Sequence, residues 1–214
     1  MGIEIVDPRV EDYLRDLLGG EHEIAAEMEE AAGEFPIVGR VVGVTLEVLA
    51  RAIGARRVLE LGSGFGYSAY WFALAVGPGG EVHMTDNDPE KQARATDYLG
   101  RAGLADRVRS HVGQALDVFD ELDGEFDVIF NDIDKTGYPE AWRRARDRIR
   151  PGGLYLCDNV LWSGRVVEGI DDAGQEEITA AVLEHNRAVA GDEGYRSTIV
   201  PTRDGVMVAV RLVG

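Results

Sequence analysis

The sequence contains little cysteine and no long apolar run, and both absences exclude classes of protein. A single cysteine, Cys157, among 214 residues cannot form an intramolecular disulfide or a cysteine-based zinc cluster. No segment approaches the ~20 consecutive apolar residues that a membrane-spanning helix requires. Residues 1–15 lack the basic start and apolar centre of a signal peptide. We therefore expect a soluble, cytoplasmic protein without a membrane partner.

Positive charge is also scarce. Lysine and arginine together number 22 against 39 aspartates and glutamates, which gives a net charge of −17. Such a surface repels nucleic acids and anionic membranes, so we expect no nucleic acid partner. Lys91 and Lys135 are the only lysines. This composition fits either a salt-rich (halophilic) cytoplasm, where screening removes the self-repulsion, or a GC-biased genome that replaces lysine by arginine.

Apolar segments with strand and helix patterns alternate along the chain, as in a parallel α/β sheet with helices on both faces. The length of 214 residues suits one domain. Helical patterns around residues 10–18 and 21–32 predict that residues 1–35 form a cap, either a cover for the sheet or a lid or dimer contact over the active site. Strands are expected at residues 57–61, 81–86, 107–112, 125–130, 154–157, 196–200 and 206–212, and helices at 41–52, 67–76, 88–99, 138–149 and 173–189.

A glycine-rich turn joins the first strand to its helix. Gly62, Gly64 and Gly66 crowd this turn, which brings backbone N–H groups and the positive end of a helix dipole close to a ligand. A dinucleotide site requires Gly-x-Gly-x-x-Gly, whereas here the spacing is Gly-x-Gly-x-Gly, preceded by Glu60. That carboxylate disfavours a pyrophosphate and suits the ammonium group of S-adenosylmethionine. The alternative is a tight turn that binds nothing.

Two further segments complete the predicted cofactor site. Asp86 ends the second strand about twenty residues after the glycines, where doubly wound sheets place the acid that binds ribose hydroxyls. Residues 113–115 follow the third strand, where they can lie against adenine.

Oxygen ligands follow two neighbouring strands. Asp132 and Asp134 come after the fourth strand, and Asp158 and Asn159 after the fifth. Ligands gather at the carboxyl ends of strands in such sheets, and hard oxygen donors favour Mg²⁺, Mn²⁺ or Ca²⁺ over zinc. Any one of these aspartates is better explained as a helix or turn cap. As a set, together with Lys135, they predict a metal site.

Three segments carry a resemblance to a known family. Residues 59–68 (Leu-Glu-Leu-Gly-Ser-Gly-Phe-Gly-Tyr-Ser), 132–135 (Asp-Ile-Asp-Lys) and 158–164 (Asp-Asn-Val-Leu-Trp-Ser-Gly) resemble the cation-dependent O-methyltransferases of the catechol and caffeoyl-CoA type. The likeness runs from about residue 38 to the C-terminus. It implies a Rossmann-like class I methyltransferase fold, a seven-stranded, mostly parallel sheet with an antiparallel C-terminal strand. Asn131, usually apolar in the family, and the additional glycine Gly64 depart from its pattern.

The resemblance implies a role for each matching position. It implies that S-adenosylmethionine is bound by Val38, Gly39, Glu60, Gly62, Tyr67, Ser68, Asp86, Gly113, Gln114, Ala115 and Asp132. Of these, Val38 and Gly39 line the methionine end, Glu60 and Ser68 hold the amino and carboxylate groups, and Asp86 binds the ribose. The metal ligands are Asp132, Asp158 and Asn159, the catalytic residue is Lys135, and Trp162 flanks the acceptor. A homodimer is also implied.

The expected reaction is methyl transfer to one hydroxyl of a catechol-like vicinal diol. A phenol has a pKa near ~10, and chelation to a dication lowers it. Lys135 could then take the proton or stabilise the phenolate. Two alternatives stay open: a nicotinamide-dependent oxidoreductase, which the glycine spacing and Glu60 disfavour, and a non-catalytic cofactor-binding partner protein.

Overall fold

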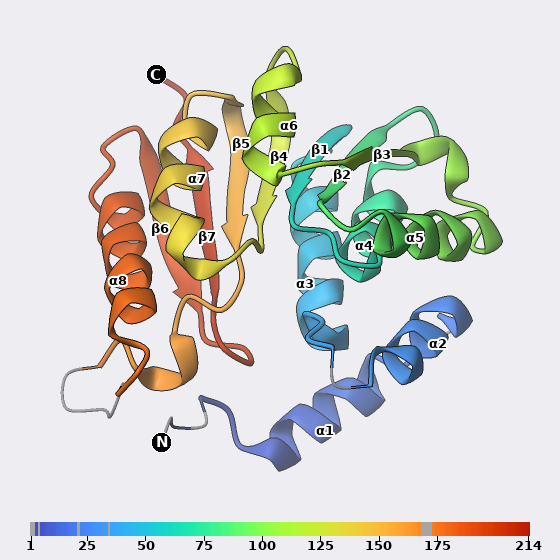
Figure 1. The fold of residues 1–214 in the computed structure, drawn as a ribbon, viewed down its shortest axis with the longest axis horizontal. Helices are drawn as coiled ribbons and strands as arrows, with labels where there is room; N and C mark the ends of the chain where they lie inside the picture. The colour runs from blue at the N-terminus through green and yellow to red at the C-terminus, as the bar shows by residue number, and fades with distance from the viewer. Residues whose placement is uncertain (1–2, 4, 21, 34, 168–172) are drawn as a thin grey trace.

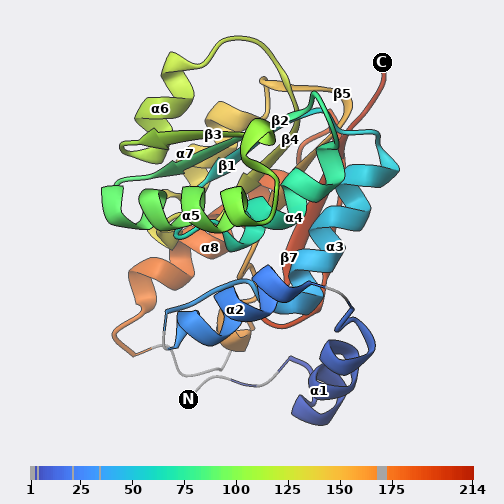
Figure 2. The same ribbon diagram turned by 90° about the vertical axis from the view of Figure 1, so that its right-hand side faces the viewer.

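The computed structural model describes residues 3, 5–20, 22–33, 35–167 and 173–214. A seven-stranded sheet lies between two layers of helices (Figures 1 and 2). The strands are β1 (Arg57–Leu61), β2 (Glu81–Asp86), β3 (Val108–Val112), β4 (Phe126–Asn131), β5 (Ile149–Cys157), β6 (Tyr195–Val200) and β7 (Val206–Arg211). The helices are α1 (Pro8–Leu17), α2 (Glu23–Ala32), α3 (Gly39–Ala52), α4 (Tyr67–Val76), α5 (Pro89–Arg101), α6 (Ala115–Glu121), α7 (Tyr138–Ala145) and α8 (Glu176–Ala190).

The strand order is β3-β2-β1-β4-β5-β7-β6. Strands β1 to β5 pair in parallel, and β7 runs antiparallel to both β5 and β6. The fold expected from the sequence is therefore confirmed. The register places Asn131 at the end of β4 opposite Leu61 of β1 and Cys157 of β5. The residues that follow these three strands consequently emerge next to one another at one edge of the sheet.

Each face of the sheet carries its own hydrophobic core. Helices α2 to α5 bury one cluster, in which Trp71 and Phe72 of α4 are fully buried. Helices α6 to α8 bury the other, around Trp142 and Tyr155. Because strands alternate their side chains, β4 contributes Phe130 to the first cluster and Ile129 to the second. The central strands are covered on both faces, as parallel sheets require.

The fifth strand begins earlier than the sequence predicts. We expected a helix to reach residue 149 and a strand to start at residue 154, but α7 ends at Ala145 and β5 begins at Ile149. The register shifts between Phe126 and Val128, which pair with Ile149 and Leu154 respectively. The segment Pro151-Gly-Gly is therefore an irregularity inside the strand, where a proline without an N–H is tolerated. Helix α6 was not predicted at all.

The N-terminal helices pack unequally. Helix α2 buries Ala25 and Met28 and packs against α4 and α5, whereas α1 has no buried residue and lies at the periphery (Figures 1 and 2). The interpretation of residues 1–35 as a lid or a dimer contact stays a prediction. Among the described helices, none combines the length and apolarity needed to span a membrane.

The close crossing of α3 and α4 yields a first prediction. A Cβ added at Gly43 would overlap Nε1 of the fully buried Trp71. Gly43→Ala should therefore lower the free energy of unfolding by about 1–3 kcal/mol, because overpacking outweighs the better helix propensity of alanine. Urea denaturation measures this change.

Gly100 provides the matched control for the same substitution. It lies in α5, is exposed, and a Cβ there would meet nothing within 4 Å. Gly100→Ala should leave the stability unchanged or raise it by up to about 1 kcal/mol. If the two substitutions changed the free energy of unfolding equally, the close packing of Gly43 against Trp71 would not be what limits the side chain at that position.

Candidate active site

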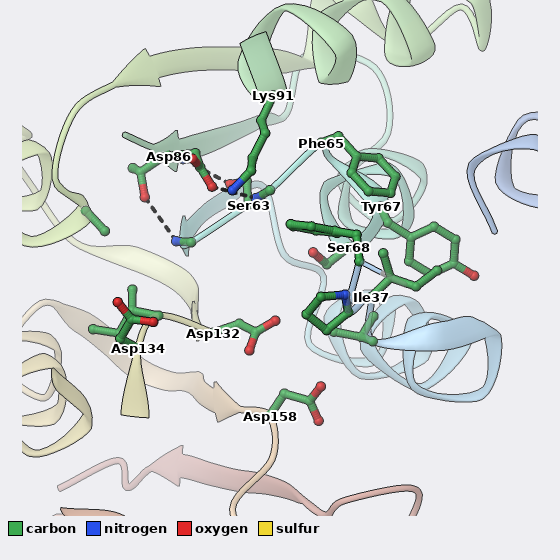
Figure 3. A pocket seen from close by; sticks show the side chains of 18 of the residues that line it. Ile37, Ser63, Phe65, Tyr67, Ser68, Asp86, Lys91, Asp132, Asp134 and Asp158 are labelled. Atoms are coloured by element: carbon green, nitrogen blue, oxygen red, sulfur yellow. Dashed lines mark hydrogen bonds between the residues drawn. The ribbon is translucent and has the colours of Figure 1, made fainter. Parts of the chain in front are cut away.

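A cavity of about 400 Å³ opens at the carboxyl ends of the parallel strands β1 to β5 (Figure 3). Most of the residues named from the sequence lie in its wall: Val38, Gly62, Tyr67, Ser68, Asp86, Gly113, Gln114, Ala115, Asp132, Lys135, Asp158 and Asn159. Gly39, Glu60 and Trp162 do not line it. The fold thus gathers the segments that follow all five parallel strands, the segment before α3 and the start of α4 around one space.

The glycine turn is shaped by contacts that exclude larger side chains. Gly62 has φ 85°, and a Cβ there would come within 2.6 Å of the Asp132 carbonyl oxygen. Gly64 has φ 50°, and its Cβ would lie 3.1 Å from the ring of Phe35. The extra glycine in this loop therefore makes room for Phe35, an aromatic residue that sequence reasoning did not place at the site.

Asp86 is oriented by backbone donors on both sides. The Gly64 N–H donates to its Oδ2 at 3.1 Å, and the Asp88 N–H donates to its Oδ1 at 2.9 Å. Gly62 N–H donates to the neighbouring Thr85 hydroxyl at 3.2 Å. These bonds tie the end of β2 to the glycine turn and hold the Asp86 carboxylate at the cavity wall.

Glu60 lies behind the cavity wall, in full burial on β1. The Ser68 hydroxyl, which does line the cavity, donates to its Oε1. Its Oε2 has no hydrogen-bond partner among the described residues. Burial raises the pKa of Glu60 to about 7. A buried carboxylate with an unpaired oxygen next to Ser68 is suited to a ligand ammonium group reached at this wall.

The Asp132 and Asp158 carboxylates project into the same space, and Asp134, which also lines the cavity, lies apart from them (Figure 3). Asp158 is only 4% exposed, and its Oδ1 has no hydrogen-bond partner in the described part of the chain. Burial raises the pKa of Asp158 to about 6. Burial and then the charge of Asp158 raise the pKa of Asp132 well above its usual range. The positive charge near this pair therefore does not fully offset the effect of burial.

Lys135 supplies one cation beside this pair. Its Nζ donates to Asn159 Oδ1 at 2.8 Å and lies 3.7 Å from Asp132 Oδ1. It also lies 5.6 Å from the centre of the Tyr138 ring. The amine thus contacts two of the three oxygen-bearing residues that the sequence suggested as metal ligands.

The loop after β5 is held in an uncommon backbone conformation. Among the described residues other than glycine, only Asn159, Trp162, Ser163 and Arg203 have a positive φ, between 46° and 56°. Three of them lie in this loop, and Arg203 lies in the turn between β6 and β7. Such conformations are costly, and they persist where surrounding contacts impose them.

Those contacts come from the β6–β7 turn. The Val160 N–H donates to Gly205 O at 3.1 Å, and the Leu161 N–H donates to Asp204 O at 2.9 Å. The Ser163 N–H donates to Asp204 Oδ1 at 2.5 Å. Trp162 packs against the second hydrophobic cluster, with the Arg165 guanidinium 5.6 Å from its ring centre. Its expected position beside an acceptor stays a prediction.

A buried polar chain supports the same loop from beneath. Asn131 Nδ2 donates to the Tyr155 hydroxyl at 3.2 Å, and that hydroxyl lies 2.9 Å from His185 Nε2. Asn186, the next residue of α8, donates from Nδ2 to Val160 O at 2.7 Å. His185 Nδ1 lies 3.1 Å from Asn186 Oδ1. Asn131 therefore belongs to a network linking β4, β5 and α8 to the loop, which explains its polarity.

Several residues in the cavity wall were missed from the sequence. Phe35 and Ile37 come from the segment before α3, Lys91 from α5, and Arg203 from the β6–β7 turn. Both lysines of the chain line the cavity, so their scarcity in an acidic sequence was a usable signal for Lys91. Arg203 gave no such signal, because it lies far along the chain from the motifs.

The burial of Glu60 yields a prediction about stability and pH. Its pKa rises from 4.5 to about 7 on folding, so the folded state binds a proton more tightly than the unfolded state. Stability should therefore fall as pH rises from about 4.5 to about 7, by up to about 1.4 kcal/mol per pH unit from this group. Glu60→Gln, which does not titrate, should flatten this slope in urea denaturation.

A surface variant controls for the loss of one negative charge. Glu193 is exposed, so Glu193→Gln should keep the slope of the parent protein. A Glu60→Gln protein with an unaltered slope over this range would contradict the assignment.

Comparison with known proteins identifies relatives over nearly the whole chain. The O-methyltransferase family model matches residues 20–212. Catechol O-methyltransferase of Niastella koreensis is 33% identical over 214 residues, which cover 94% of this chain and 96% of that one. Catechol O-methyltransferase of Mycobacterium tuberculosis is 38% identical over 171 residues, 78% of each chain.

Solved structures give the same result. The O-methyltransferase from Streptomyces achromogenes involved in tomaymycin synthesis, in complex with S-adenosylmethionine, has a TM-score of 0.86, 31% identity and 96% coverage of both chains. The O-methyltransferase from Bacillus cereus, in complex with S-adenosylhomocysteine, has a TM-score of 0.85 and 28% identity, covering 95% of this chain and 97% of that one. The resemblance carried by the three sequence segments is thus confirmed, and this chain belongs to the O-methyltransferase family of enzymes.

Proposed function

We propose that this enzyme transfers the methyl group of S-adenosylmethionine to one hydroxyl of a catechol-like vicinal diol, and that the reaction depends on a divalent cation. The observation that carries this proposal is the convergence of Asp132 and Asp158 on one cavity beside the glycine turn. The printed names of the relatives, which include catechol O-methyltransferases and caffeoyl-CoA O-methyltransferases, support the acceptor class.

The residues present fit a hard dication. Two carboxylates and the Asn159 amide offer oxygen donors, and the buried Oδ1 of Asp158 has no partner in the described residues. The described residues hold no cluster of three or more histidine, cysteine, aspartate or glutamate side chains, so any site here relies on the amide. The raised pKa values of Asp132 and Asp158 indicate a pair that a dication would stabilise.

Such an ion, most simply Mg²⁺ but also Mn²⁺ or Ca²⁺, lowers the pKa of a chelated phenol when bound. The side chains of the protein would then bind the cofactor, orient the acceptor and hold or transfer its proton. Asp86 and the segment 113–115 would hold the ribose and adenine of the cofactor, and Glu60 with Ser68 its amino acid end. Lys135 Nζ, placed between Asn159 and Asp132, would take the acceptor proton or stabilise the negative oxygen.

The two rival functions are less well supported. Membership of the O-methyltransferase family favours methyl transfer over nicotinamide-dependent oxidation. A non-catalytic binding protein would have no need for the set formed by Asp132, Lys135, Asp158 and Asn159 in one cavity. Incubation with labelled S-adenosylmethionine and a panel of catechols tests the proposed reaction directly.

Metal removal should abolish that activity. EDTA treatment followed by desalting should reduce methyl transfer to background, and added Mg²⁺ should restore it. Calorimetric titration of Mg²⁺ into the metal-free protein gives a second readout, which Asp158→Asn should weaken about tenfold or more. Full activity in a preparation verified to be metal-free would show that Asp132, Asp158 and Asn159 serve only as structural caps.

Substitution of the lysine separates turnover from cofactor binding. Lys135→Ala should lower kcat by about 10²–10⁴-fold, the usual contribution of a positioned acid or base. The dissociation constant for S-adenosylmethionine should stay nearly constant, because the Lys135 amine contacts the candidate metal ligands Asn159 and Asp132. Lys135→Arg, which keeps the charge but cannot lose a proton, should stay inactive if the amine is a base and recover partly if it stabilises charge. An unchanged kcat would remove Lys135 from the mechanism.

A further inference from the structure

Three cationic side chains line this cavity together with four aspartates, Asp86, Asp132, Asp134 and Asp158. The chain has a net charge of −17 and only two lysines, yet Lys91, Lys135 and Arg203 all line the space. Lys91 extends from α5 toward the Asp86 end (Figure 3), with its Nζ 5.0 Å from the centre of the Phe35 ring. The Lys135 amine already forms a hydrogen bond with Asn159 and an ion pair with Asp132. Arg203 is the cation without an assigned role.

Arg203 lies beside the loop that contains the candidate metal ligands. It occupies the β6–β7 turn, whose residues Asp204 and Gly205 accept hydrogen bonds from Val160 and Leu161. Its Nη1 donates to Ile37 O at 2.7 Å, across 166 positions of sequence. A Cβ at Gly39 would come within 2.5 Å of the same nitrogen, so the guanidinium packs closely on the start of α3. The guanidinium is therefore held against the start of α3, on a turn that is bonded to the loop after β5.

The backbone of this arginine is held in a costly conformation. Arg203 has φ 46°, and hydrogen bonds from Gly205 N–H to Thr202 O at 2.8 Å and from Thr202 N–H to Val200 O at 2.9 Å close the turn around it. A residue other than glycine here costs about 1 kcal/mol or more. Backbone strain of this kind is found often at ligand-binding sites, and the Arg203 side chain lines the cavity.

The guanidinium presents an unused edge. In the part of the chain that the structure describes, its only hydrogen bond is the one from Nη1 to Ile37 O. Nε and Nη2 form the edge that binds a carboxylate or phosphate through two parallel hydrogen bonds. A guanidinium that is anchored by Nη1, in a cavity wall that also contains Asp158 and Asn159, is therefore arranged to bind an anion in the same cavity as the candidate metal site.

We propose that Arg203 binds an anionic substituent of the acceptor, so that the favoured acceptors are catechol-like diols that carry a carboxylate or phosphate. This inference rests on the proposed function and specifies its substrate class. The anion could be a carboxylate on the acceptor itself or a phosphate on an attached carrier. Both bind the Nε–Nη2 edge in the same way, and the choice of acceptors separates them.

Three acceptors with the same ring and diol provide the test. Caffeate carries a carboxylate, its methyl ester is neutral, and caffeoyl-CoA carries phosphates. The expected result is that Arg203→Gln lowers the ratio of kcat/KM for the anionic acceptor over that for the ester by about 10- to 100-fold, the effect of losing a charge-assisted pair of hydrogen bonds. Arg203→Lys should restore part of the ratio. The acceptor whose ratio collapses, caffeate or caffeoyl-CoA, identifies the anion.

Arg196 on β6 provides a matched control, because it is exposed and does not line the cavity. Arg196→Gln removes the same charge and should keep the ratio of the parent enzyme. A ratio unchanged by Arg203→Gln would overturn the proposal. Loss of affinity for S-adenosylmethionine with an unchanged ratio would also overturn it, because the guanidinium would then bind the cofactor carboxylate.

A binding measurement keeps this inference separate from the proposed function. Calorimetric titration of caffeate and of its methyl ester into the protein loaded with S-adenosylhomocysteine and Mg²⁺ gives the same comparison without turnover, because this cofactor product has no methyl group to transfer. Absence of methylation for all three acceptors would contradict the proposed function. Even then, tighter binding of caffeate than of its ester, lost in Arg203→Gln, would support the present inference. Equal binding of acid and ester to the parent protein would contradict it.

Discussion

Two carboxylates held side by side at the ends of β4 and β5 constrain the rest of this enzyme. Parallel pairing in register places Asn131 beside Cys157, so Asp132 and Asp158 leave the sheet next to each other. Burial raises the pKa values of both groups, and the charge of Asp158 raises that of Asp132 further, which means that the fold bears a cost at this position. Positive charge nearby offsets that cost, from Lys135 in the chain and, in the proposed reaction, from a divalent ion.

The surrounding structure keeps these groups in place. The loop after β5 contains most of the left-handed residues of the described chain other than glycine. Backbone hydrogen bonds from the β6–β7 turn hold it on one side, and the chain of Asn131, Tyr155, His185 and Asn186 holds it from below. A loop braced from two directions can keep oxygen donors at fixed positions, which is what binding a hard cation and orienting an acceptor require.

Much of the framework was predictable from local pattern. The bounds of β1, α4 and β2 match the expectation, because a buried apolar run broken by glycines admits few conformations. The predicted boundary between α7 and β5 was wrong, because the residues Pro151-Gly-Gly are typical of a turn that ends a helix or strand. It becomes a strand irregularity only when β4 pairs beside it. Helix α6 is short, and its two buried residues, Val118 and Phe119, give too little periodicity to identify it.

By itself the sequence determined the fold class, the glycine turn and the candidate acidic residues at the strand ends, because each depends on residues that are close along the chain or follow a strand directly. Only the tertiary structure decided which side chains share the cavity. Phe35 packs on Gly64, and Arg203 reaches Ile37 across 166 residues. Glu60 and Trp162 instead lie outside the wall. These contacts depend on how segments distant in the sequence pack against one another, and a local sequence pattern carries no information about that packing.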